Sequence, residues 1–112
     1  MKIIKDELEK ISDKEKAKVY QGYFKTGKGE YGEGDVFVGI STPMQRKIAK
    51  EHSDLSIAKI QQLIKSEIHE HRAVALFILI EKYEKANDED KENIFSFYLK
   101  NNKKVLNRFF LK

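Results

Sequence analysis

The feature that most constrains the fold is an unbroken run of apolar residues, Ala73 to Ile80, inside a longer helical pattern. A helix that is apolar on every side has to be buried all round, so this segment is expected in the most buried helix of the chain. The run is far shorter than the roughly 20 residues that a helix needs to cross a bilayer. The N-terminus turns acidic at Asp6 and Glu7, too soon for a signal peptide. We therefore expect a soluble, cytoplasmic protein without a membrane partner.

Apolar residues recur at helical spacing on both sides of this run. Ser12 and Glu15 form an S-x-x-E capping box that predicts a helix start, and Ser56 is the expected N-cap of another helix. The segment Asp35–Val38 is the best strand candidate, but it is short and lacks a partner strand. The other expected helix faces comprise Ile3, Ile4, Leu8 and Ile11; Ala17, Val19, Tyr20, Tyr23 and Phe24; Met44, Ile48 and Ala49; Ile57, Ile60, Leu63 and Ile64; and Ile94, Phe95, Tyr98 and Leu99.

The spacing therefore predicts an all-α chain that forms one domain over residues 1–112, with antiparallel helix pairs joined by short turns. Asn101 and Asn102 are expected to end the sixth helix, and a further apolar segment runs from Val105 to Leu111. A net charge of +4 and a pI of about 9.2 permit a nucleic-acid partner without requiring one. The absence of cysteine excludes disulfides and thiolate metal sites.

Two patterns that resemble cofactor or metal sites are better explained as structural features without a ligand. Gly27–Gly32 matches G-x-G-x-x-G, but a helix precedes it and more loop follows, whereas a dinucleotide site needs a strand before it and a helix after it. His69 and His71 stand two residues apart, and such side chains point away from each other on a helix. We expect neither cofactor nor metal, and assign Glu70 and Arg72 to a polar helix edge or a buried ion pair.

The stretch from Tyr23 to Lys47 contains five of the six glycines, the only proline and a basic cluster. Thr42 is the expected N-cap of a helix near Pro43–His52, with Gln45 completing a T-x-x-Q capping box. Outward-pointing amides at a helix start, with Arg46 and Lys47 close by, suit an anion such as a phosphate. The alternative is that these residues only cap a helix and form its polar, solvent-exposed surface.

The same stretch resembles the DNA alkylation repair family, bacterial DNA glycosylases built from HEAT-like helical repeats. The resemblance rests on F-K-T-G-K-G-E-Y-G-E-G-D followed by F-x-G-I-x-T-P-x-x-R, with a second patch at His71–Tyr83. It covers most of the chain, from about Ala17 to Leu99. It implies a HEAT-like stack of antiparallel helix pairs (an α-α superhelix) and hydrolysis of N-glycosidic bonds to N3- or N7-alkylated purines, without metal or nucleotide cofactor.

The resemblance also suggests how this chain contacts double-stranded DNA. Residues of the family at this helix start approach the DNA, at the positions matched here by Ser41 and Thr42. The DNA-binding residues that we expect, for weak and non-specific contact, are Ser41, Thr42, Arg46, Lys47, Lys25 and Lys28.

The resemblance breaks at the C-terminus. The family has a signature I-N-N-W-D-L-V-D, whose last Asp is catalytic, and the corresponding stretch here is Leu106–Lys112. Asn107 matches, Phe109 stands where the Trp should be, and the Asp would follow Lys112. We therefore interpret the chain as a truncated, N-terminal portion of a family member. It is expected to keep part of the DNA-binding surface and to lack the catalytic carboxylate, so the sequence does not decide whether the chain is an enzyme. The alternative is a non-catalytic helical-repeat interaction module, or a homo-oligomer formed through the C-terminal apolar segment.

Overall fold

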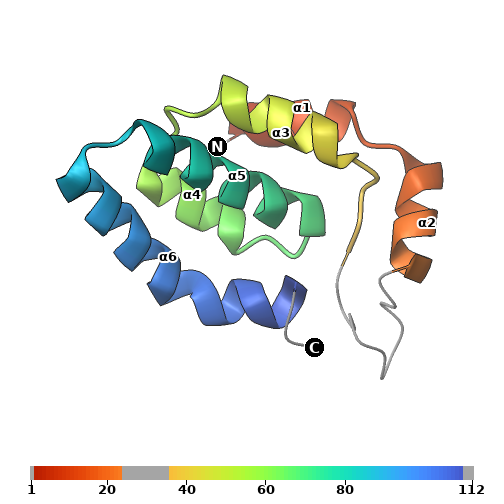
Figure 1. The fold of residues 1–112 in the computed structure, drawn as a ribbon. Coiled ribbons are helices and arrows are strands. Elements are labelled where there is room, and N and C mark those ends of the chain that lie inside the picture. The colour runs from red at the N-terminus through yellow and green to blue at the C-terminus, as the bar shows by residue number, and fades with distance from the viewer. Residues whose placement is uncertain (1, 24–35, 110–112) are drawn as a thin grey trace.

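The computed structural model describes residues 2–23 and 36–109, with the side chains of residues 4–22 and 36–101 (Figure 1). This part of the chain is all-α, as predicted, and its helices pack as a helical stack. Between described residues, the only strand-like pairing is one parallel bridge between Val36 and Ile68. The helices are α1 (Lys2–Lys10), α2 (Lys14–Tyr23), α3 (Thr42–Glu51), α4 (Ile57–Ile64), α5 (His69–Lys85) and α6 (Asp88–Phe109).

Helix α5 is the centre of the molecule and packs against α3, α4 and α6 (Figure 1). Its residues Val74, Ala75 and Ile78 are completely buried. The rest of the core comes from α1, α3, α4 and the loop before α3, namely Ile4, Leu8, Ile40, Ile48, Ala49, Ile60, Leu63 and Ile64. None of the described helices is long and apolar enough to cross a membrane.

The expectation that Ala73 to Ile80 is buried all round is wrong at one edge of α5. Ile80 is 52% exposed, and Leu76 and Phe77 are only partly buried. The reason is that Phe77 and Ile80 line an open surface groove between α5 and α3, so α3 does not cover them completely. The sequence could not reveal this edge, because an apolar helix has no polar stripe to mark its open side.

Two of the three predicted helix starts lie one residue away from the expected position. Asp13, not Ser12, caps α2: its Oδ1 accepts from the amides of Glu15 at 2.9 Å and Lys16 at 3.2 Å. The Ser12 hydroxyl instead donates back to the carbonyl of Leu8 at 2.8 Å. Ser56 is confirmed as the N-cap of α4, since its Oγ accepts from the amide of Lys59 at 3.3 Å.

Helix α6 is continuous through the two asparagines that were expected to end it. Asn101 donates from its side-chain amide to the carbonyl of Phe97, one turn earlier, at 2.9 Å. The asparagine is thus accommodated on the helix instead of breaking it. The start of α6 is acidic, with Asp88, Glu89 and Asp90 in the first turn, and the sequence contains no acidic residue after Glu92.

Candidate nucleic-acid interface

The loop that leads into α3 is fastened to α5 by the Glu70 side chain. Its Oε1 accepts from the amide of Val38 at 3.1 Å, and its Oε2 accepts from the amides of Gly39 at 2.9 Å and Ile40 at 3.2 Å. Glu70 is fully buried, and buried carboxylates need such partners because they lose their hydration. Glu70 therefore fixes the position of the chain immediately before α3.

Gly39 lets the loop approach the start of α2 closely enough for this arrangement. Its φ is +81°, in the left-handed region that favours glycine. A Cβ atom at this position would lie 2.0 Å from the carbonyl oxygen of Asp13 and 2.8 Å from the amide nitrogen of Ala17. The amide of Asp13 donates to the carbonyl of Val38 at 2.8 Å, so the loop is bound on both sides.

The segment before this loop packs against the beginning of α5. The amide of His69 donates to the carbonyl of Val36 at 2.8 Å. The Phe37 ring stacks on the His69 ring with centroids 4.4 Å apart, and meets the edge of the Tyr20 ring at 6.1 Å. Aromatic packing and backbone hydrogen bonds together position residues 36–40.

At the start of α3 the N-cap is Ser41, one residue before the expected Thr42. Ser41 makes no side-chain capping bond. Gln45 instead turns back, and its Nε2 donates to the carbonyl of Ile40 at 2.7 Å. Pro43 is therefore at the second helical position and not at the first, where the Thr42 cap would have placed it, and it still lies in the first turn. The first-turn amides of Thr42 and Met44 have no helical carbonyl to bond, which gives this end of α3 its partial positive charge.

Beyond this first turn, α3 presents basic side chains along a groove of about 530 Å³. Arg46 lies over the Phe77 ring of α5, with its guanidinium carbon 4.8 Å from the ring centroid. Lys47 also lines the groove. The full lining consists of Pro43, Arg46, Lys47, Lys50, Phe77, Ile80, Glu81 and Glu84.

The structure brings together four of the six residues expected to bind DNA. Ser41 is half-buried, while Thr42, Arg46 and Lys47 are exposed on the first turns of α3. The other two, Lys25 and Lys28, lie outside the described residues. The sequence did not predict two roles seen in the structure. Phe77 supports the Arg46 guanidinium, and Glu70 binds the loop before α3. A charged residue three positions before the long apolar run, on the helix expected to be most buried, was the available signal for Glu70.

A separate cavity of about 340 Å³ is bordered by α2, residues 37–40, the first turn of α3 and the start of α5. It is lined by Val19, Tyr20, Phe37, Ile40, Thr42, Gln45, His69 and Glu70.

The His69-Glu70-His71 triplet has three separate packing roles. His69 stacks on Phe37, Glu70 binds the loop, and Nδ1 of His71 lies 3.0 Å from the hydroxyl of Ser66. Burial, with the positive charges of Lys5 and Arg72, lowers the pKa of His71 to about 4. Among the residues that the structure describes, no group of three or more His, Asp or Glu side chains could hold a metal ion.

Comparison with known proteins supplies the remaining evidence on identity. No curated protein and no solved structure matches the chain significantly. A family description matches residues 4–108, which include every helix discussed above except the first residues of α1 and the end of α6. This chain therefore belongs to the DNA alkylation repair enzyme family.

Proposed function

We propose that this chain serves DNA alkylation repair by holding duplex DNA against the first turns of α3. The observation that supports this most directly is the fixed loop before α3, where Glu70 binds three consecutive amides. A phosphate contact requires its donors in a defined geometry, and this loop sets the direction in which the first-turn amides of α3 point. Thr42 and Ser41 lie at that point, with Arg46 and Lys47 one turn further along.

The charge balance of this surface favours weak, sequence-independent binding. Arg46, Lys47 and Lys50 offer positive charges to a phosphate backbone, but Glu81 and Glu84 line the same groove and oppose it. Phosphate contacts release counterions, so the affinity should decrease steeply as salt is added. Phe77 limits the motion of the Arg46 guanidinium, which lowers the entropy lost when Arg46 binds a phosphate.

The substrate class implied by the family resemblance is DNA containing N3- or N7-alkylated purines, whose N-glycosidic bond is hydrolysed. We propose that the described residues hold this DNA and do not break the bond. Glu70 is the one fully buried acid among them, and both of its oxygens are engaged by backbone amides. The chemical step needs a carboxylate free to stabilise the developing positive charge of the sugar.

The test is binding of a fluorescent duplex followed by anisotropy across a salt series. Arg46→Ala and Lys47→Ala should each weaken binding and reduce the slope of log K against log salt by about one unit, the value for one lost phosphate contact. Lys59→Ala removes the same charge from the exposed surface of α4 and is the matched control. Unchanged affinity in Arg46→Ala, with circular dichroism showing a folded chain, would exclude this interface.

A second candidate function, a non-catalytic interaction module, is favoured by a separate observation. Phe95 and Leu99 on α6 are more than half exposed, which is unusual for large apolar side chains so close together. A stable oligomer without any DNA binding would favour this second function.

A further inference from the structure

The groove between α3 and α5 has two walls of opposite charge. Its α3 wall carries Arg46, Lys47 and Lys50, whereas its α5 wall carries Glu81 and Glu84. Within the described part of the chain, no ion pair joins the two walls. Both sets of charges are therefore available to a ligand. A ligand complementary to this groove is anionic along one side and presents hydrogen-bond donors along the other.

The floor of the groove, between these walls, is apolar and partly open to solvent. Ile80 is 52% exposed, and the Phe77 side chain beside it is half-buried. The exposed Arg46 side chain reaches over the Phe77 ring, with its guanidinium carbon 4.8 Å from the ring centroid. Unpaired nucleobases stack on apolar and aromatic side chains and on guanidinium groups. The floor thus offers a surface for the flat faces of bases.

We infer that this groove holds an unpaired stretch of one DNA strand, an inference that rests on the function proposed above. The phosphates of the strand lie along the basic wall of α3, its base faces lie on the apolar floor, and the base amino groups donate to Glu81 and Glu84. A single strand presents all three features together. In a paired duplex the bases are stacked and paired with each other, so the acidic wall would meet phosphates and repel them.

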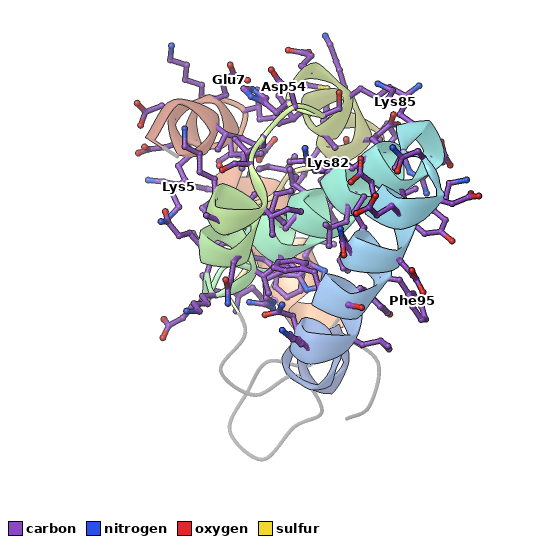
Figure 2. All side chains as sticks on the ribbon, turned by 90° about the vertical axis from the view of Figure 1, so that its left-hand side faces the viewer. Lys5, Glu7, Asp54, Lys82, Lys85 and Phe95 are labelled. Atoms are coloured by element: carbon purple, nitrogen blue, oxygen red, sulfur yellow. The ribbon has the colours of Figure 1, made fainter. Side chains whose placement is uncertain are left out.

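The test compares two fluorescent DNAs by anisotropy, namely a fully paired duplex and the same duplex with a short central run of mismatches. The parent chain should bind the mismatched DNA at least about tenfold more tightly, a gain typical of base stacking on a protein. Ile80→Ser should lower this ratio of affinities at least about threefold. Phe95→Ser is the matched control and should leave the ratio unchanged. Phe95 is 54% exposed on α6 and extends away from the other helices in Figure 2.

A second pair of variants tests the acidic wall. Glu81→Gln with Glu84→Gln should raise the affinity for the paired duplex more than that for the mismatched DNA, because glutamine still accepts from base amino groups but no longer repels phosphates. The ratio should therefore fall. Glu89→Gln with Glu92→Gln on α6 changes the net charge equally and should leave the ratio as in the parent.

The outcomes separate this inference from the function proposed above. A parent that binds both DNAs equally would overturn the inference and leave the contact of α3 with DNA intact. A ratio that stays unchanged in Ile80→Ser, or after substitution of the acidic wall, would have the same meaning. A parent that binds neither DNA would refute the proposed function and, with it, this inference.

Discussion

The amide of Gly39 donates a hydrogen bond to the Glu70 carboxylate at 2.9 Å, although the two residues are 31 positions apart in the chain. Both are buried, and the bond links the loop before α3 to the first turn of α5. Charge-assisted hydrogen bonds to backbone amides are among the stronger ones in proteins. This contact therefore fixes the position of the start of α3, the candidate DNA-binding helix, relative to α5.

Glu70→Gln tests the importance of this carboxylate. Glutamine preserves the size of the side chain but places an NH₂ group where an oxygen accepted a backbone N–H, so at least one buried amide loses its partner. We expect a loss of about 2 kcal/mol in the free energy of unfolding, measured by urea denaturation. Glu67→Gln, an exposed neighbour, is the control and should cost little. Equal stability of the two variants would show that the amides of residues 38–40 do not depend on Glu70.

Gly39→Ala and Gly22→Ala form a matched pair of identical chemical changes. At Gly39 the new methyl group would collide with the backbone of Asp13, and the positive φ would add strain, so we expect a loss of about 3 kcal/mol or more. Gly22 lies in α2 with nothing within 4 Å of the added atom. There the substitution should stabilise the chain by up to about 1 kcal/mol, because alanine is the better helix former. Equal thermal midpoints for the two variants would contradict the close approach at Gly39.

His71 should make the stability of the fold depend on pH. Its pKa is about 4 in the folded chain and 6.5 ordinarily, so the unfolded chain binds more protons at this group between these values. The contribution is complete above pH 6.5 and is lost progressively as the pH falls toward 4. His71→Asn, which can still bond to Ser66, should flatten the profile of urea midpoint against pH over this interval. Parallel profiles for the parent and the variant would refute a lowered pKa for His71.

The purified 112-residue polypeptide should release no N3- or N7-alkylated purine from methylated duplex DNA. Phe109 stands where the resemblance calls for Trp, and no acidic residue follows Glu92 in the sequence. Loss of a charge that stabilises a transition state typically costs on the order of a hundredfold or more in rate. The assay measures free base, with an active family member as the positive control. Release that a substitution such as Glu81→Gln abolishes would identify a catalytic carboxylate within this chain.

Much of the local structure followed from the sequence because it depends on neighbouring residues. The spacing of Ile57, Ile60, Leu63 and Ile64 predicted α4, and Ser56 its cap, since both rely on interactions within a few residues. The starts of α2 and α3 were shifted by one residue for a physical reason. Asp13 competes with Ser12 as a cap, and the Gln45 side chain bonds Ile40 instead of completing a capping box with Thr42.

The sequence by itself determined the helical class of this protein, the buried character of most of α5 and the basic surface of α3, because periodicity and composition are local properties. Only the tertiary structure decided that Glu70 binds the loop of residues 38–40 and that Arg46 lies over Phe77. It also decided that Ile80, Phe95 and Leu99 remain exposed. These outcomes depend on which helices become neighbours, and two segments distant in the chain become neighbours only when the whole core packs.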